Sequence, residues 1–355
     1  MKVLITSPSL NENENVSGIS TMISSVIANS DCKFTHFTAG RKDGEKSGLK
    51  WLVSQARLPF AFRRTISSLR PDVVHINTSL EPRAIIRDAI LARSARRYPV
   101  IVHLHGGRFA LDQTPPPWVN LAIKDLLKSA ARVVVLSDED AESISKRVPG
   151  IEISVLPNAI ATDEFPDSDR PWGTKSITYL GRLTEAKGLS EIVETTRLLR
   201  QQGFKFKFVA YGTGQDQNEF IRRMTSVLGE DFHYGGIVAG AEKIKALSAA
   251  DIFLMPSRFE GLSLALLEAM AAGCVPVVSA RGSIPSVVED GRNGFLVDPG
   301  DITQIVGRLK FLLSEGETGW NEYRRNARET VRNEFDLKNY VVKLKDIYSG
   351  ILATR

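Results

Sequence analysis

The segment RFEGLSLALLEAM, residues 258–270, carries two glutamates, Glu260 and Glu268, in a largely apolar run. Ser263 is a favourable helix N-cap, so we expect a helix over residues 264–272, with Glu260 in the loop before it. Glu268 then lies in the middle of an apolar helix, where burying an ionised carboxylate without partners is costly. The position therefore requires a basic partner, an exposed helix edge or a polar ligand.

Arg182 and Lys187 lie in the segment GRLTEAKG, residues 181–188, which follows the apolar run SITYL. We expect this segment to be a loop between a strand and a helix. Such a loop suits a diphosphate, because backbone N–H groups and the helix dipole face the anion while the two cations neutralise it. A solvated loop with incidental surface charges is the alternative.

A second glycine turn, Gly212–Gly214, follows the apolar run FKFKFVAY. It lies at the carboxyl end of a predicted neighbouring strand, which is where open α/β sheets bind ligands, although an ordinary turn has the same composition. No G-x-G-x-x-G follows the first predicted strand, and no Walker A sequence is present. A dinucleotide-dependent dehydrogenase and a P-loop phosphoryl transferase are therefore disfavoured.

Short apolar runs alternate with longer amphipathic ones along the chain, which is the pattern of βαβ units around a parallel sheet. The predicted strands are KVLIT, DVVHI, VIVHLHG, RVVVLS, ISVLPNA, SITYLG, FKFKFVAYG, FHYGG, DIFLMPS and VPVVSA. The predicted helices lie near 18–29, 81–97, 118–130, 138–147, 188–202, 215–228, 240–249 and 264–272.

The polar stretch TDEFPDSDRPWGT, residues 162–174, lacks apolar periodicity and is the best linker in the chain. A chain of 355 residues also exceeds a typical single core. We therefore expect two doubly wound, Rossmann-like domains, 1–164 and 165–335, which face each other across a cleft. An amphipathic helix is expected over 336–355, and packing back on the N-terminal domain is one option for it.

The composition is that of an ordinary globular protein, with 43% hydrophobic and 25% charged residues. A net charge of +5 and a pI near 9.1 favour anionic partners such as sugar nucleotides, lipid phosphates or nucleic acid. Cys32 and Cys274 are too far apart to suggest a disulfide framework. No apolar run is long enough for a signal peptide or a membrane span, so we expect a cytoplasmic protein, in solution or on the inner face of the cell membrane.

Four segments of the second half resemble the retaining glycosyltransferases of family 4, the glycosyl transferases group 1. These are GRLTEAKG, GTG, ADIFLMPSRFEGLSLALLEAMAAGCVPVV and DGRNGFLVDPGD, the last at 290–301. The most specific part is the pair of glutamates with seven residues between them, after Pro-Ser and before Ala-Met-Ala-Ala-Gly. The resemblance implies the GT-B fold, in which two Rossmann-like domains form the enzyme.

The resemblance also implies roles for individual residues. Arg182 and Lys187 would bind the donor diphosphate, Glu260 would contact the transferred sugar, and Glu268 would contact the nucleotide ribose. His105, at the end of VIVHLHG, looks like the family histidine that reaches the donor sugar. The predicted catalytic residues are thus Glu260, His105, Arg182 and Lys187. The predicted substrate-binding residues are Gly18, Arg182, Lys187, Gly212, Gly214, Gly261, Leu262, Ser263 and Glu268.

In the implied reaction, fixed cations and N–H donors stabilise the negative charge that builds on the leaving phosphate. The resemblance implies retention by front-face attack, in which the donor phosphate helps to deprotonate the acceptor hydroxyl. No Asp-x-Asp is present to hold a divalent ion, so we expect no metal and no other cofactor. The expected donor is a nucleoside-diphosphate sugar, UDP-sugar in preference to GDP-sugar. The expected acceptor is a glycan or a polyprenyl-linked sugar in exopolysaccharide or surface polysaccharide biosynthesis.

Arginines are concentrated in the first half, in and after WLVSQARLPFAFRRTISSLRP, at positions 57, 63, 64, 70, 83, 87, 93, 96 and 97. Basic residues interleaved with apolar ones are typical of a helix that lies on an anionic membrane, although a solvated helical face has a similar pattern. Pro59 is expected to interrupt any helix in this segment.

Three other functions remain open on the sequence. A sugar-nucleotide epimerase can use the same fold, but the paired glutamates favour transfer to an acceptor. A non-catalytic partner that binds sugar nucleotide and anchors another transferase to the membrane is disfavoured by the intact Arg182, Lys187, Glu260 and Glu268. Nucleic-acid binding lacks a helix-turn-helix signature or an aromatic and basic sheet motif.

Overall fold

The computed structural model describes residues 1–11, 14–15, 17–40, 48–107, 109, 114–166 and 175–354. Residues 167–174 of the predicted linker lie outside this part of the chain. The chain forms two compact units. Unit 1 consists of Met1–Ala159 and Leu337–Arg355, and unit 2 consists of Ile160–Asp336.

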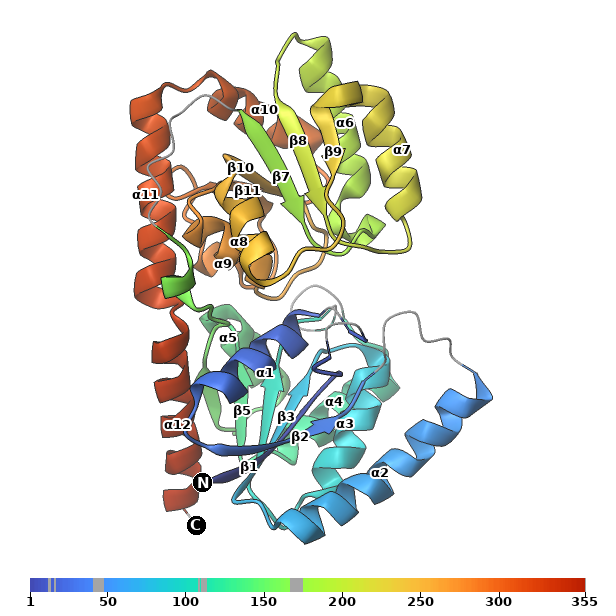
Figure 1. Ribbon diagram of the computed structural model, residues 1–355. Coiled ribbons are helices and arrows are strands. Elements are labelled where there is room, and N and C mark those ends of the chain that lie inside the picture. The colour runs from blue at the N-terminus through green and yellow to red at the C-terminus, as the bar shows by residue number, and fades with distance from the viewer. Residues whose placement is uncertain are drawn as a thin grey trace. The chain divides into compact units, whose positions relative to one another are not determined.

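Unit 1 is built on a sheet of six parallel strands in the order β2-β1-β3-β4-β5-β6 (Figure 1). Apolar runs such as KVLITS form strands that are buried on both faces, as expected for a parallel sheet. The strands are β1 Lys2–Ser7, β2 Lys33–Thr38, β3 Val73–Thr78, β4 Val100–Leu104, β5 Arg132–Val135 and β6 Ile153–Val155.

Helices cover the sheet of unit 1. They are α1 Gly18–Asn29, α2 Leu49–Leu69, α3 Pro82–Ser94, α4 Pro117–Lys128, α5 Asp138–Arg147 and α12 Leu337–Ala353. The connection from β1 to β2 moves towards one end of the strand order, and the connections from β2 to β6 move towards the other end. Right-handed crossovers therefore place α1 on one face and α2 to α5 on the other.

The last helix, α12, belongs to unit 1 although the whole of unit 2 precedes it in the chain. It packs against α1, and the hydroxyl of Tyr348 lies 2.6 Å from Nδ1 of His75 on β3. Lys345 donates to Asp31 at 2.5 Å, near the end of α1. These contacts tie the C-terminal helix to the first unit.

Helix α2 runs without interruption through Pro59, so the expectation that this proline breaks the helix is wrong. Proline inside a helix removes one backbone hydrogen bond and leaves one carbonyl four residues earlier without its donor. Here that carbonyl belongs to Gln55, which is partly exposed, so water can satisfy it. The exposed position of α2 thus makes the proline tolerable.

Unit 2 has a second sheet of six parallel strands, in the order β12-β11-β10-β7-β8-β9 (Figure 1). The strands are β7 Ser176–Leu180, β8 Lys207–Tyr211, β9 Phe232–Tyr234, β10 Ile252–Met255, β11 Val275–Ser279 and β12 Phe295–Val297. The helices are α6 Leu189–Gln201, α7 Gln217–Leu228, α8 Gly240–Ser248, α9 Leu264–Ala271, α10 Ile302–Ser314 and α11 Glu317–Glu334. Two doubly wound α/β units are therefore confirmed.

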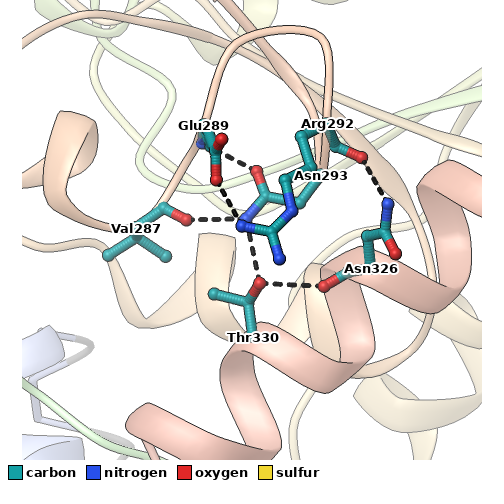
Figure 2. Close-up of polar contacts among 6 residues, drawn as sticks. All are labelled: Val287, Glu289, Arg292, Asn293, Asn326 and Thr330. Atoms are coloured by element: carbon teal, nitrogen blue, oxygen red, sulfur yellow. Dashed lines mark hydrogen bonds and ion pairs between the residues drawn. The ribbon is translucent and has the colours of Figure 1, made fainter.

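The loop 287–294, between β11 and β12, is held by the side chain of Asn293, whose polar contacts Figure 2 shows. This side chain is buried, with only 3% of it exposed. Its oxygen accepts from the backbone N–H of Glu289 at 2.8 Å. Its amide donates to the carbonyl of Val287 at 2.9 Å and to the hydroxyl of Thr330 on α11 at 3.0 Å. One buried amide thus closes the loop and fastens it to a helix that is distant in sequence.

Candidate active site

The loops of unit 2 that carry or support the predicted site residues follow β7, β8, β10 and β11. They lie at the carboxyl edge of the sheet. The chain runs from β7 to β8 and β9 on one side, and then returns to β10, β11 and β12 on the other. The strand order therefore reverses between β7 and β10, which are hydrogen-bonded neighbours. Ligands of open α/β sheets bind at this kind of switch point.

The loop 181–188 leaves β7 and contains the short 3-10 helix Glu185–Lys187. Gly188 has a φ of 78°, and a Cβ there would lie 2.2 Å from the carbonyl oxygen of Pro256. Only glycine fits this position, because the loop after β7 and the loop after β10 are in backbone contact. The hydroxyl of buried Tyr179 donates to the carbonyl of Arg182 at 2.8 Å and fixes the start of the loop.

Gly212 and Gly214 allow the loop after β8 to press against the loop after β7. A Cβ on Gly212 would lie 1.9 Å from the oxygen of Gly181, and one on Gly214 would lie 2.1 Å from the oxygen of Leu183. The N–H of Leu183 also donates to the oxygen of Thr213 at 2.9 Å. These glycines thus have a structural reason to be glycine, and their predicted contact with substrate stays a prediction.

Lys187 and Glu260, both predicted catalytic residues, form an ion pair with each other. The Nζ of Lys187 lies 2.6 Å from Oε1 of Glu260, and the Glu260 side chain is only 9% exposed. The pair joins the loop after β7 to the loop after β10. Lys187, which is predicted to bind phosphate, and Glu260, which is predicted to contact the sugar, are therefore in contact with each other.

Glu268 lies in the middle of α9, as expected, and is 7% exposed. Its Oε1 accepts from Nζ of Lys243 on α8 at 2.6 Å. Burial raises the pKa of the Glu268 carboxyl, and the charge of Lys243 opposes that rise. Of the alternatives open for this carboxylate, the structure shows a basic partner, and the predicted contact with a ribose stays a prediction.

The start of α9 is a capped helix N-terminus at the same edge of the sheet. Ser263 is the N-cap and accepts from the N–H of Leu266, as its sequence position predicts. Gly261 and Leu262 precede it, and the carbonyl of Gly261 accepts from the N–H of Ser283 at 3.0 Å. A Cβ on Gly282 would lie 2.1 Å from the carbonyl oxygen of Glu260, so the loop after β11 supports the loop that carries this glutamate.

In unit 1, His105 follows β4 and its Nε2 lies 2.7 Å from Oδ1 of Asn77. The amide of Asn77 donates to the carbonyl of Thr6, so its oxygen faces His105 and accepts a hydrogen bond from the Nε2–H of that ring. Burial lowers the pKa of His105 to about 4, and a hydrogen bond with Asn158 partly opposes this. His105 is therefore a neutral imidazole at physiological pH.

Behind His105 lie two further histidines in a stacked row. The ring centroids of His103 and His105 are 4.2 Å apart, and those of His75 and His103 are 5.4 Å apart. Burial lowers the pKa of His75 to about 3 and holds the pKa of His103 well below its usual range. The row carries no charge at neutral pH, as suits the structural role expected for His75 and His103.

Gly18 is the first residue of α1, whose N-cap Ser17 accepts from the N–H of Ser20 at 3.3 Å. A Cβ on Gly18 would have no atom within 4 Å. Its backbone therefore borders open space at the carboxyl edge of the first sheet. The structure brings the predicted residues of unit 2 together at one sheet edge, whereas Gly18 and His105 belong to the other unit.

Lys243 and Arg258 are candidate site residues that the sequence motifs do not reveal. Arg258 donates to the buried carboxylate of Glu191 at 2.7 Å and connects the loop before α9 to α6. The apolar setting of Glu268 indicates that a cation is needed, but no local pattern shows which one. Within the described ranges, no group of three His, Cys, Asp or Glu side chains is placed to hold a metal ion.

Comparison with protein families gives two matches that together cover most of the chain. The model of glycosyl transferases group 1 matches residues 161–334, and that of a glycosyl transferase 4-like domain matches residues 27–159. None of the helices in the described part of the chain has the length and apolar character needed to cross a bilayer.

Individual relatives and structures agree with these matches. The UDP-Gal:alpha-D-GlcNAc-diphosphoundecaprenol alpha-1,3-galactosyltransferase of Escherichia coli is 25% identical, with 86% of this chain and 82% of that protein covered. The GDP-mannose:cellobiosyl-diphosphopolyprenol alpha-mannosyltransferase of Xanthomonas campestris is 23% identical, with 72% and 69% covered. Sucrose-phosphate synthase from Thermosynechococcus elongatus has the same fold, with a TM-score of 0.82 at 17% identity over 100% of both chains.

Proposed function

The chain belongs to the glycosyl transferases group 1 and is a GT-B glycosyltransferase, and from this premise we propose that it transfers a sugar from a UDP-sugar, with retention, to a polyprenyl-linked or glycan acceptor. Relatives of this chain act in polysaccharide and lipid-linked sugar biosynthesis. We place this chain in exopolysaccharide or surface polysaccharide assembly at the cytoplasmic face of the membrane.

The observation that carries the proposal is the arrangement of two lysine–glutamate pairs at the switch point of unit 2. Lys187 pairs with Glu260 and Lys243 pairs with Glu268, each at 2.6 Å, on loops and helices that follow β7, β9 and β10. A sugar nucleotide offers a diphosphate to Lys187 and hydroxyl groups to the carboxylates of Glu260 and Glu268, while Lys243 supports the buried carboxylate of Glu268. Both ends of the donor thus find matching groups at one sheet edge.

Donor binding exchanges partners at the first pair. Lys187 leaves the carboxylate of Glu260 for a diphosphate oxygen, and Glu260 turns to the hydroxyl groups of the sugar. Arg182 and the N-terminus of α9 add positive charge and N–H donors to the leaving diphosphate. Because protein groups supply this stabilisation, the proposed reaction needs no metal ion and no other cofactor.

The UDP assignment is supported by the Escherichia coli relative, which this chain matches over more of its length than it matches the GDP-mannose relative. Both of these relatives act on lipid-diphosphate acceptors by name. An acceptor of this class requires the enzyme to work at a membrane surface, which agrees with the arginines of the first unit.

The test is a transfer assay with UDP-galactose, UDP-glucose, UDP-N-acetylglucosamine and GDP-mannose against a polyprenyl-diphosphate-linked sugar, with the product anomer read by NMR. We expect an α-linked product from a UDP-sugar, and activity that persists in excess EDTA. Lys187→Ala and Arg182→Ala should each lower turnover by roughly two to three orders of magnitude, since each removes a cation from the developing charge. Lys207→Ala, exposed at the opposite edge of the sheet, is the control.

An inverted product would refute retention, and turnover from GDP-mannose alone would refute the UDP assignment. Loss of activity in EDTA that magnesium or manganese restores would refute metal independence. Near-normal transfer by both cation variants would remove Arg182 and Lys187 from the diphosphate site.

A further inference from the structure

The outer sides of α3 and α4 in unit 1 carry large apolar side chains that the fold leaves in solvent. Ile86 and Ile90 of α3 are 42% and 45% exposed, and Trp118 and Leu121 of α4 are 59% and 70% exposed. A spacing of three or four residues puts each pair on one side of its helix. These four side chains are called the α3–α4 face below.

The four side chains form one continuous patch, because the two helix sides that carry them are neighbours. Helix α3 packs against α4 (Figure 1). Arg93, one turn beyond Ile90, donates to Asp125, one turn beyond Leu121, at 2.8 Å, and both partners are exposed. The ion pair therefore marks the far end of the patch and shows that the apolar sides run next to each other.

The other end of the patch lies at the carboxyl edge of the sheet, where His105 follows β4. Trp118 is in the first turn of α4, the helix that comes next in the chain. The prolines of the run 115–117 precede it, and Pro117 opens the helix with a preset φ. A large aromatic side chain is thus held in solvent at a rigid position, near the edge that holds the predicted site residues of unit 1.

The surroundings of the patch are strongly cationic. Among the described side chains of α2, α3 and α4, the basic ones are Arg57, Arg63, Arg64, Arg83, Arg87, Arg93, Lys124 and Lys128. The acidic ones are Asp88 and Asp125, and each is paired with an arginine of α3. An apolar centre with a basic rim matches the acyl boundary and the phosphates of an anionic bilayer.

The same charge argues against a second copy of this chain as the occupant. Two copies that meet through this face would bring two basic rims together, and juxtaposed like charges disfavour association. Aliphatic side chains such as Ile86, Ile90 and Leu121 also offer nothing to a nucleic-acid phosphate. The charge and the apolar surface together therefore favour a lipid surface.

We infer that the α3–α4 face inserts into the headgroup region of an anionic membrane, with Trp118 and Leu121 as its apolar anchors. This rests on the proposed function only for the lipid-linked acceptor. The insertion places the carboxyl edge of the first sheet, with His105, next to the bilayer surface. A sugar on a polyprenyl diphosphate then reaches that edge without leaving the membrane.

The experiment is flotation of the full chain with vesicles of phosphatidylglycerol and phosphatidylcholine, and with vesicles of phosphatidylcholine alone. The variant is Trp118→Ser/Leu121→Ser, and the matched control is Val342→Ser/Leu352→Ser, which removes exposed apolar side chains from α12 of the same unit. We expect the partition coefficient of the first variant to anionic vesicles to fall by about tenfold or more. The control should bind like wild type. Substitutions at such exposed positions should leave the melting temperature nearly unchanged.

A second arm separates this inference from the proposed function. Calorimetric binding of UDP should be the same in wild type and in Trp118→Ser/Leu121→Ser, so a failure of donor binding in wild type would count against the transferase proposal alone. Unchanged vesicle binding by the variant, or equal binding to neutral vesicles, would overturn the membrane assignment. So would self-association of wild type in sedimentation velocity that the variant abolishes, since the face would then join two copies.

Discussion

The Nζ of Lys243 lies 2.6 Å from Oε1 of Glu268, across the contact between α8 and α9. Burial raises the pKa of this carboxyl, and Lys243 is the cation that opposes the rise. Lys243 therefore favours the ionised form of Glu268, and an ionised carboxylate is the better acceptor for two ribose hydroxyl groups. The lysine acts as a positioning residue for a site that it need not touch.

Lys243→Met should weaken UDP binding by about tenfold, which is about 1.4 kcal/mol, because the Glu268 carboxyl loses the cation that favours its ionised form. Without the cation, Glu268 is protonated over a wider pH range, so UDP affinity of the variant should rise more steeply with pH than that of wild type. Calorimetry between pH 6 and 8.5 measures both effects. The control is Lys245→Met, an exposed lysine on the same helix.

A double-mutant cycle tests whether Lys243 works through Glu268. In the Glu268→Gln background, Lys243→Met should have little further effect on UDP affinity. The carboxyl group whose ionised form Lys243 favours is then absent. If the two losses add in full, Lys243 acts on the ligand directly and the positioning role is wrong.

The two glutamates should affect different halves of the donor. Glu268→Gln should weaken binding of free UDP by about 1–3 kcal/mol, because ribose hydroxyl groups lose their acceptor. Glu260→Gln should leave UDP affinity unchanged or improve it, because Lys187 loses its competing carboxylate. Its effect should appear in transfer from the intact sugar nucleotide. Equal weakening of UDP binding by both variants would contradict this division.

Stability should fall between pH 6.5 and pH 4 because of the histidine row in unit 1. The folded pKa values of His105 and His75, about 4 and about 3, lie below the ordinary value of 6.5. The unfolded chain therefore binds protons in this window that the folded chain does not. The contribution of these histidines to the free energy of unfolding is fully present above pH 6.5. As the pH falls from 6.5 towards the folded pKa, each histidine lowers the free energy of unfolding by about 1.4 kcal/mol per pH unit.

His103→Leu should make the free energy of unfolding fall less steeply as the pH is lowered, because it removes one buried imidazole from the row. Scanning calorimetry at pH 7.5, 6, 5 and 4.5 gives the pH dependence for wild type and variant. His233→Gln, at an exposed position on β9, should keep the wild-type slope. Parallel curves for His103→Leu and wild type would show that the row does not control acid stability.

Asn293→Ala should destabilise unit 2 by about 1–3 kcal/mol, because the buried partners of the amide lose their hydrogen bonds. For a unit of this size, each kcal/mol lowers the melting temperature by about 2–4 °C. Arg292→Ala in the same loop breaks the exposed pair with Glu289 and should leave the melting temperature of unit 2 nearly unchanged. Similar losses in both variants would mean that the loop is not closed by Asn293.

Local patterns were enough to predict most elements. The helix predicted at 138–147 coincides with α5, because Ser137 caps it and the apolar run before it ends in β5. Strand β2, with the half-buried sequence KFTHFT, was not predicted, since alternation in it is weak. Strand β12 and helices α10 and α11 were not predicted either, although the segment DGRNGFLVDPGD, which carries part of the resemblance, contains β12.

Long-range pairs were beyond sequence reasoning for a different reason. Lys243 and Glu268 are 25 residues apart, Asn293 and Thr330 are 37 apart, and His75 and Tyr348 are 273 apart. Each pair depends on which helices and strands become neighbours, and no local periodicity contains that information. Glu268 shows the limit clearly, because its need for a partner was evident from its apolar neighbours while the partner itself was not.

The placement of α12 in unit 1 has a consequence for the order of events during synthesis. Unit 2 is one continuous stretch, Ile160–Asp336, whereas unit 1 needs Leu337 and the residues after it. Domains ordinarily complete in the order in which they leave the ribosome. Here all residues of the second unit are synthesised before α12, and His75 on β3 lacks its contact with the Tyr348 hydroxyl until α12 has emerged. The nascent chain therefore carries an incomplete first unit until α12 has been synthesised, and a chaperone that binds nascent chains should recognise the surface that α12 later covers.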